Sequence, residues 1–363
     1  METKNKCTLL IDGNWLLRSR GSKFEEDFSS DKSDLEKNIA KTQTVDLMAR
    51  SVAITLMRFQ GVVDNMILCV DSKSWRKSVD RPSSLVAEYK GTRKKKANVD
   101  WDAVFDSLHM LEECFKSAGV TVSNTWEAEG DDAIWRWSGR LNAEGTNCII
   151  WTSDNDLRQL ARYTPGIAWT VWYNDKNGIV ADDSLNGSKD DDLMVFMESA
   201  RTLSNKMLLD QAIRCAGSAR WENPDIVIME KIVCGDKSDN IKSIVRSSKG
   251  SKEYRISEKK WNEIREKLGI NSMRDFILSK DRILDEAFSV TAVAGTTMTR
   301  KDAAEQLEYN MKLVWLDASQ VPESVSMGID AVEYRVCDTE SIILNYKLLT
   351  GEDNKAVEEL FVF

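Results

Sequence analysis

The stretch Leu9-Leu10-Ile11-Asp12 decides the fold, because it is a short apolar run of strand length that ends in an acid. Three further runs of this kind follow along the chain, and turn or helical patterns separate them. Such alternation is typical of βαβ units, so the sequence predicts an α/β fold with a mostly parallel central sheet flanked by helices. The predicted strands are Cys7 to Ile11, Met66 to Val70, Val120 to Val122 and Cys148 to Trp151.

Acidic residues stand at or just after the end of every predicted strand. Asp12 ends the first strand, Asp71 ends the second and Asp154 follows the fourth. The carboxyl ends of parallel strands meet at one edge of a sheet, where ligands bind, so these acids are expected to converge on one crevice. A single aspartate there is often only a helix N-cap, but capping does not account for four groups. The acids after the third strand are Glu127, Glu129, Asp131 and Asp132.

Carboxylates crowded in this way repel one another unless a cation lies between them. Oxygen ligands without histidine favour Mg²⁺ or Mn²⁺. Asp154 and Asp156 are two residues apart, and Asp236 and Asp239 are three apart, a spacing that puts both on one face of a helical turn. Two ions held by such groups would suit hydrolysis of a phosphodiester bond.

Composition excludes several classes of enzyme. The 363 residues contain one histidine, His109, which falls in an amphipathic helical pattern, so neither a Ser-His-Asp triad, nor a Cys-His pair, nor a histidine-zinc site is expected. The seven cysteines form no CxxC pair, which indicates reduced thiols in a cytoplasmic protein. No stretch approaches the roughly 20 apolar residues that span a bilayer, so no membrane contact is expected.

The net charge of −9 argues weakly against a nucleic-acid partner, but the bases are concentrated in two segments. The segment from Lys73 to Lys96 carries nine bases and two acids, and the segment from Lys242 to Lys267 carries nine bases and four acids. Such runs are usually solvated surface. Beside the acids, however, they suggest phosphate binding, and the ring of Tyr89 next to Lys90 suggests base stacking.

Together these motifs, in this order, resemble the structure-specific 5′-nuclease family over positions 7 to about 245. That family includes flap endonucleases, the 5′-nuclease domain of bacterial DNA polymerase I and phage ribonuclease H exonucleases. The most specific piece is Gly235-Asp236-Lys237-Ser238-Asp239-Asn240-Ile241. The other pieces are Leu10 to Asn14, Cys69 to Asp71, Tyr89-Lys90-Gly91-Thr92-Arg93, Glu129-Gly130-Asp131-Asp132 and Ser153-Asp154-Asn155-Asp156.

The resemblance implies a role for each matching residue. It implies a primary metal cluster of Asp12, Asp71, Glu129, Asp131 and Asp154, with Asp132 as a further ligand or directly behind it, and a second cluster of Asp156, Asp236 and Asp239. Asp12, Asp71, Asp154, Lys90 and Arg93 would be catalytic, the last two as bases of a helical arch. The expected nucleic-acid contacts are Tyr89, Lys90, Arg93, Lys94, Lys242, Arg246, Lys249 and Lys252.

After Asn240 the sequence departs from the cellular members, which continue into a glycine-rich helix-hairpin-helix. The divergence resembles the T-even phage ribonuclease H branch and implies a modified helix-hairpin-helix. We therefore expect a nuclease domain over 1–225, with an arch at about 73–100, and a mainly helical DNA-binding domain over 226–363. The end of the chain, Leu360-Phe361-Val362-Phe363, would pack in the core or bind a replication clamp.

The implied activity is that of a two-metal, Mg²⁺-dependent 5′-3′ exonuclease and flap endonuclease with ribonuclease H activity, in which Mn²⁺ can substitute. It would remove RNA primers and 5′ flaps in DNA replication. The alternatives are a PIN-like ribonuclease and a catalytically inactive DNA-junction binding protein. The expected partners are DNA and RNA/DNA hybrids, with a sliding clamp and a single-strand-binding protein as further candidates. The protein would be a cytoplasmic monomer, in the host cell if phage-encoded.

Overall fold

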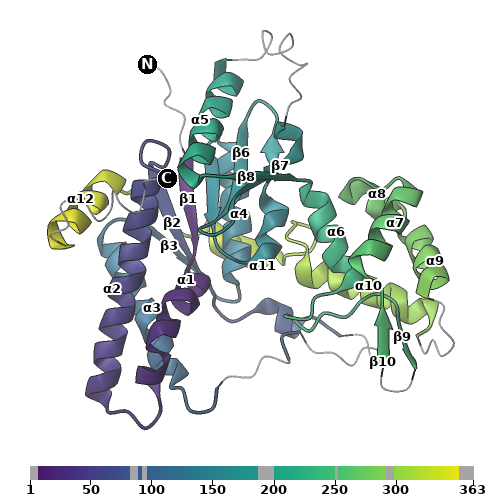
Figure 1. Cartoon of the computed structure of the whole chain (residues 1–363), viewed down its shortest axis with the longest axis horizontal. Coiled ribbons are helices and arrows are strands. Elements are labelled where there is room, and N and C mark those ends of the chain that lie inside the picture. Colours follow the sequence, from purple (N-terminus) through teal and green to yellow (C-terminus); the bar gives the residue numbers. More distant parts are fainter. Residues whose placement is uncertain are drawn as a thin grey trace.

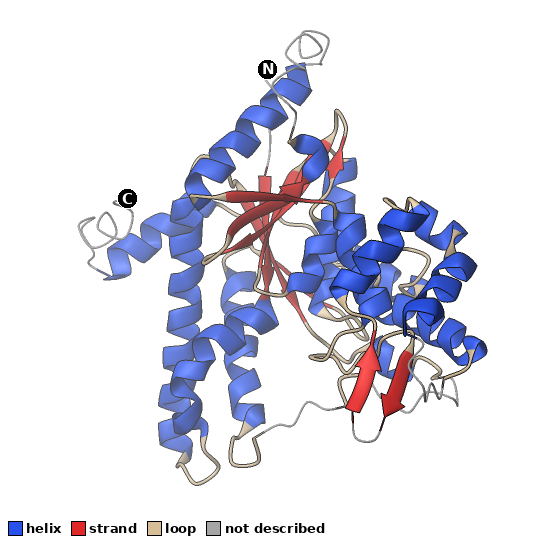
Figure 2. Ribbon diagram, turned by 45° about the vertical axis from the view of Figure 1, so that its right-hand side comes forward, coloured by secondary structure: helices blue, strands red, loops and turns tan. Residues whose placement is uncertain are grey.

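The computed structural model describes residues 7–81, 89–91, 96–186, 200–249, 252–291 and 298–350. Within them a central sheet is flanked by helices, and a second, mainly helical part lies beside it (Figures 1 and 2). The predicted α/β fold with a mostly parallel sheet and a helical C-terminal part is therefore confirmed. No helix among the described residues is both long and apolar enough to cross a membrane.

The sheet has the strand order β3-β2-β1-β4-β6-β7-β8. Strands β1 (Cys7–Asp12), β2 (Asn65–Val70), β3 (Thr121–Asn124), β4 (Asn147–Trp151) and β6 (Ala168–Asn174) run parallel. Strand β7 (Gly178–Asp182) turns back antiparallel to β6, β8 (Ala219–Glu222) is parallel to β7, and the short β5 (Tyr163–Thr164) pairs with β6. The carboxyl ends of β1, β2, β3 and β4 thus share one edge.

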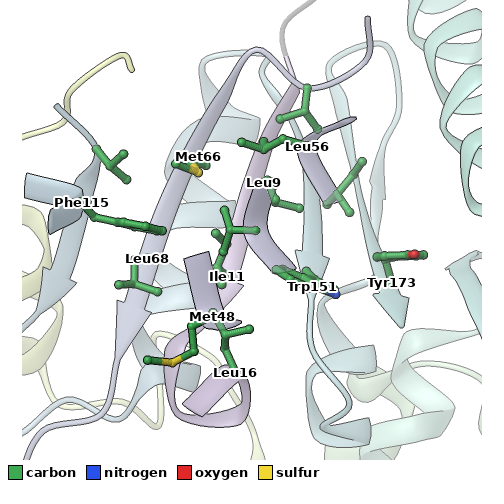
Figure 3. Close-up of a cluster of buried hydrophobic side chains, with 14 of the residues drawn as sticks. Leu9, Ile11, Leu16, Met48, Leu56, Met66, Leu68, Phe115, Trp151 and Tyr173 are labelled. Atoms are coloured by element: carbon green, nitrogen blue, oxygen red, sulfur yellow. The ribbon is translucent and has the colours of Figure 1, made fainter. Parts of the chain in front are cut away.

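Both faces of the sheet are covered, as the uninterrupted apolar strands require. Leu9 and Ile11 of β1 pack with helices α1 (Gly13–Gly21), α2 (Asp34–Arg58) and α3 (Trp101–Ser117), which Figure 3 shows in close-up. Leu10 points to the other face, where α4 (Gly130–Ala143) and α11 (Glu323–Asp330) lie. The remaining helices of this part are α5 (Ala200–Ala216), α12 (Thr339–Thr350), η1 (Ser22–Phe28), η2 (Trp75–Ser78), η3 (Asn155–Leu160) and η4 (Asp183–Leu185).

The helical part has a core of its own, which includes Trp261, Phe276 and Leu307. It is built from α6 (Pro224–Cys234), α7 (Glu258–Leu268), α8 (Met273–Leu278), α9 (Lys280–Thr291) and α10 (Arg300–Val314). A two-stranded antiparallel hairpin, β9 (Arg246–Lys249) with β10 (Lys252–Arg255), stands between α6 and α7. The region expected to be a modified helix-hairpin-helix therefore carries inserted strands.

The last described segment returns to the sheet instead of staying with the helical part. Leu316 and Ile329 pack in the core cluster of α4, and Ile343 of α12 packs in the cluster on the opposite face. Arg136 of α4 also forms an ion pair with Asp330 at the end of α11. The described chain from 316 to 350 thus covers the sheet. This segment lies within the C-terminal domain predicted over 226–363.

Candidate active site

A polar cleft of about 700 Å³ lies at the carboxyl edge of the parallel strands. It is lined by eight acids that come from the strand ends, from the start of α4 and from the turn after α6, and by two lysines and an arginine. The acids are Asp12, Asp71, Glu129, Asp131, Asp154, Asp156, Asp236 and Asp239, and the bases are Arg18, Lys90 and Lys231. The cleft thus brings together every acid of the two expected clusters, while Asp132 is not among its lining residues.

Asp12 is held rigidly because it is both the last residue of β1 and the N-cap of α1. One carboxylate oxygen accepts the backbone N–H of Trp15 at 2.9 Å, and the other accepts the Thr152 hydroxyl at 2.7 Å. Burial, together with the nearby charges of Asp71 and Asp154, raises the Asp12 pKa to about 7. A carboxyl group in this state has too little compensating positive charge around it.

Asp71 and Asp131 are in the same electrostatic state. Asp71 follows β2, and its Oδ1 accepts the N–H of Gly130 at 2.6 Å, while a Cβ at Gly130 would lie 3.0 Å from that oxygen. Burial and the Glu129 charge raise the pKa of Asp71. Burial, Asp154 and Asp12 raise the pKa of Asp131, on the first turn of α4.

Glu129 differs from these acids because three side chains donate to it. Its carboxylate accepts Lys90 Nζ at 3.0 Å, Arg76 Nη1 at 3.0 Å and the Tyr89 hydroxyl at 3.2 Å. Burial alone would raise the pKa of Glu129, but Arg76 and Lys90 lower it to about 2. Glu129 is therefore ionised, and the protein itself compensates its charge.

Asp132 is fully buried behind the cleft and does not face it. Arg76 donates to both of its carboxylate oxygens, at 2.7 and 3.0 Å, and the Trp75 indole N–H and the Glu129 backbone N–H also donate to Oδ2, at 3.0 and 2.9 Å. Both oxygens are thus used within the protein. In this conformation Asp132 lies where a supporting residue would lie, rather than a direct metal ligand.

The second acidic group contains a lysine that the sequence interpretation did not include. Lys231 on α6 forms ion pairs with Asp156 and, at 2.8 Å, with Asp236. Burial would raise the pKa of Asp236, yet Lys231 and the Ser238 hydroxyl lower it to about 2. Asp239 is buried at the same end of the cleft, and its carbonyl oxygen accepts the N–H of Lys90 at 2.8 Å.

The donor set can be tested for a divalent cation. Within the described residues no three His, Cys, Asp or Glu side chains form a ready-made ligand set for one ion. The chemistry nevertheless fits a hard cation, because Asp12, Asp71 and Asp131 offer only oxygen and have raised pKa values. Mg²⁺ usually keeps several waters, so carboxylates that do not form a complete ligand set can also hold it through those waters.

The expected nucleic-acid contacts are only partly within the described structure. Tyr89 is 6% exposed and packs in the core of the helical part, so in this conformation its ring is not available to stack on a base. Arg93 and Lys94 lie outside the described residues, as do the side chains of Lys249 and Lys252 in β9 and β10. Lys242 is half-buried, and Arg246 donates to Gln306 Oε1 at 3.4 Å.

A second cleft of about 770 Å³ adjoins the first and shares Arg18, Asp71, Lys90 and Glu129 with it. Its apolar wall includes Leu17, Val104 and two aromatic rings of α3, whose centroids are 6.4 Å apart. Exposed bases line its rim. The rings belong to Trp101 and Phe105, and the further bases are Lys73 and Lys77.

Sequence reasoning missed Arg76 and Lys231 as members of the site. Arg76 was counted within a basic surface segment, but it is buried against two acids. Lys231 lies in an ordinary helical pattern, and only its distance of five residues from Asp236 gave any signal. Both bases form ion pairs with acids at the crowded edge of the sheet. The excess of acids indicated that positive charge must lie nearby, but it did not identify the residues that carry that charge.

Comparison with known proteins gives three kinds of similarity. Residues 8–186 match the family described as 5′-3′ exonuclease, N-terminal resolvase-like domain. Ribonuclease H of Enterobacteria phage T4 is 25% identical over 170 residues, which cover 41% of this chain and 55% of the phage protein. The match thus spans about half the length of that curated relative.

Among solved structures, the bacteriophage T5 D15 protein co-crystallised with metal ions is similar at 16% identity and a TM-score of 0.51. The T5 D15 flap endonuclease in complex with DNA and metal ions matches at 15% identity and a TM-score of 0.51. Both alignments cover 96% of this chain and 100% of the T5 chain. At these identities the likeness shows the shared fold.

Proposed function

Because this chain belongs to the 5′-nuclease family, we propose that it is a divalent-metal-dependent 5′-3′ exonuclease and flap endonuclease. Its substrates would be DNA and RNA/DNA hybrids with 5′ ends or flaps, as in the removal of RNA primers and flaps during replication. The observation that carries the proposal is the cleft in which carboxylates from four separate strand ends meet, three of them with raised pKa values.

Asp12, Asp71, Asp131 and Asp154 are proposed to hold the cation, which we take to be Mg²⁺ with Mn²⁺ as a substitute. When bound, such an ion lowers the pKa of a water molecule and offsets charge on the phosphodiester. The fixed hydrogen bonds of Asp12 and Asp71 keep their carboxylates aimed at the cleft. Asp132 is proposed to position Glu129 and the start of α4 through Arg76, not to bind metal.

Lys90 is proposed to hold the reacting phosphate. Its ammonium lies at the edge of the cleft, 3.0 Å from Glu129, and the residue adopts a positive φ of 55°. A substrate phosphate would compete with Glu129 for this ammonium, and Glu129 would keep Arg76 as a partner. Arg93 and Lys94 are proposed to act from the same arch.

Unpaired nucleotides beside the reacting phosphate are proposed to enter the adjoining cleft. The half-buried rings of Trp101 and Phe105 line this cleft and would offer stacking surfaces, and base stacking on aromatic side chains is worth about 1–3 kcal/mol per base. Lys73, Lys77 and Arg18 would contact the backbone phosphates. This assignment takes the place of the stacking role that was predicted for Tyr89.

Duplex binding is proposed for the helical part, through Lys242, Arg246, Lys249 and Lys252. We propose 1–225 as the nuclease unit and 226–363 as the DNA-binding unit. Within the second unit, residues 316–350 pack against the sheet of the first. The clamp and single-strand-binding protein remain proposed partners, and the monomeric, cytoplasmic state remains a prediction. The C-terminal Leu360 to Phe363 lies outside the described residues.

The test is cleavage of 5′-labelled flap, nicked-duplex and RNA/DNA hybrid substrates with Mg²⁺, with Mn²⁺ and with EDTA, using Asp12→Asn as a matched inactive control. We expect cleavage at or near the 5′ junction with either metal and none with EDTA or the variant. Cutting of single-stranded RNA in preference to these substrates would favour the PIN-like ribonuclease. Tight junction binding without cleavage under any metal would favour the inactive binding protein.

A further inference from the structure

Lys231 bridges two of the three acids of the second acidic group, Asp156 and Asp236. Its ammonium forms ion pairs with Asp156 and with Oδ2 of Asp236. The other oxygen of Asp236 accepts the backbone N–H of Ser238 at 2.7 Å and the Ser238 hydroxyl at 2.6 Å. Both oxygens of Asp236 are therefore already bound to protein donors.

The backbone fixes this arrangement. Gly235 ends α6 with a φ of 75°, and a Cβ there would lie 2.5 Å from the carbonyl oxygen of Ile241, so the turn requires glycine. Asp236 and Ile241 exchange two backbone hydrogen bonds, at 2.9 and 2.7 Å. The chain is thus folded back after α6, so that Asp236 faces Lys231, which lies in the last turn of that helix. The ion pair is a product of a rigid turn and not of two free surface side chains.

The first acidic group contrasts with this one. In the part of the chain that the structure describes, none of Asp12, Asp71 and Asp131 forms an ion pair with a lysine or arginine, whereas Lys231 contacts two acids of the second group. In the first group Glu129 is paired with Arg76 and Lys90. A divalent cation entering that group nevertheless meets Asp12, Asp71 and Asp131 with no ammonium or guanidinium paired directly to them, although the charge of Lys90 acts on Asp71 and Asp131 from nearby. One entering the second group must first displace an ammonium, since two cations cannot share the same oxygens without strong repulsion.

We propose that the Lys231 ammonium is a built-in cation of the second acidic group. The chain would then bind one divalent ion tightly at the first group and a second only by displacing Lys231. This inference rests on the proposed function, because it takes the first group to be a metal site. On this proposal, Lys231 is the residue that makes the protein bind the second divalent ion more weakly than the first.

The experiment is calorimetric titration of the metal-free full chain with Mg²⁺, supported by electron paramagnetic resonance counting of bound Mn²⁺. Wild-type protein is expected to show one tight ion and one weaker ion. Lys231→Met should tighten the weaker ion by roughly tenfold or more, the scale on which residues around metal ligands change metal affinity. The matched control is Lys237→Met, an exposed lysine beside Asp236 that does not line the cleft and should leave both ions unchanged.

A second readout covers the chance that the metal-free variant is poorly folded. Lys231→Met leaves Asp156 and Asp236 without their ammonium, so its melting temperature without metal should fall, and added Mg²⁺ should raise that temperature more than it does for wild type. Lys231→Gln gives the same comparison with a polar side chain. Equal melting shifts for all variants, or two equally tight ions in wild type, would overturn the inference.

These readouts also separate the inference from the proposed function. If wild type and Lys231→Met differ in metal binding as expected but neither cleaves any 5′-end substrate, the inference stands and the nuclease proposal fails. If both cleave with Mg²⁺ and bind two ions identically, the nuclease proposal stands and the role of Lys231 fails.

Discussion

Arg76 Nη2 donates to Oδ1 of Asp132 at 2.7 Å, and both side chains are buried directly behind the acidic cleft. The same guanidinium donates to Glu129 at 3.0 Å and, through Nε, to the carbonyl oxygen of Leu313 at 2.8 Å. A single cation therefore joins the start of α4, one acid of the cleft and the end of α10. Arg76 is therefore one of the contacts that join the acidic edge to the helical part, together with the hydrogen bond from Gln159 to the carbonyl oxygen of Val314.

Arg76→Met should destabilise the protein by about 3–5 kcal/mol, because it leaves the buried Asp132 without its counter-charge and Glu129 with Lys90 as its remaining ion-pair partner. Chemical denaturation at neutral pH measures the free energy of unfolding. The double variant Arg76→Met with Asp132→Leu should recover part of the loss, since it removes that uncompensated charge. If the double variant is as unstable as the sum of its single changes predicts, the two residues are not coupled in the way the contact implies.

Asp12→Asn should lower the single-turnover cleavage rate by at least about 10²-fold, the scale of removing one group that stabilises charge in the transition state. Binding of a flap substrate should change little, because the substitution removes charge without adding bulk. Asp71→Asn and Asp154→Asn should behave alike. Near-normal turnover by any two of the three would contradict the assignment of the first acidic group.

The raised pKa of Asp12 predicts that the stability of the metal-free protein depends on pH, and Asp12→Asn tests this. The unfolded chain releases the Asp12 proton near the ordinary value of 3.8, whereas the folded chain keeps it up to about 7. The folded state therefore binds more protons between these values, so the unfolding free energy falls as pH rises through them. Asp12→Asn lacks this loss, and its melting temperature should rise relative to wild type from pH 4 to pH 7. A difference that does not vary with pH would refute the pKa assignment.

Much of the fold could be predicted because it depends on local patterns. The run Leu9-Leu10-Ile11 indicates a strand buried on both faces, and the structure places its side chains alternately in the two core clusters. The convergence of acids after β1, β2 and β4 followed from parallel pairing alone. By contrast, the β9–β10 hairpin stands in a polar, basic segment without the apolar alternation that marks a strand.

Side-chain partners across the chain could not be predicted, because they depend on packing between distant segments. Tyr89 looked like an exposed ring beside basic residues, but it packs in the core of the helical part, more than 130 residues away in sequence from α6 and α10, and its hydroxyl donates to Glu129. Arg76 likewise looked like one base of a solvated run. Neither burial is visible in residue type or spacing.

Lys90→Met should lower the single-turnover rate by at least about tenfold while changing substrate affinity little, because the ammonium would act on the reacting phosphate. Glu129 keeps Arg76 and Tyr89 as partners, so the variant should fold normally. The matched control is Lys77→Met, at the rim of the adjoining cleft, which should weaken affinity and reduce its salt dependence without slowing the chemical step. If both variants changed affinity alone, Lys90 would be only a backbone contact.

Trp101→Leu tests the adjoining cleft as the place of unpaired nucleotides. The change keeps an apolar side chain on the first turn of α3 but removes the ring, so it should cost about 1–3 kcal/mol of binding for a flap with unpaired 5′ nucleotides. A nicked duplex with no unpaired nucleotide should bind as it does to wild type. Fluorescence anisotropy in Ca²⁺ or EDTA, where no cleavage occurs, measures both affinities.

Phe105→Leu should show the same selective loss, whereas Trp126→Leu, which changes an exposed ring outside both clefts, should show none. Equal losses on flap and nicked substrates would mean that α3 contacts the duplex instead.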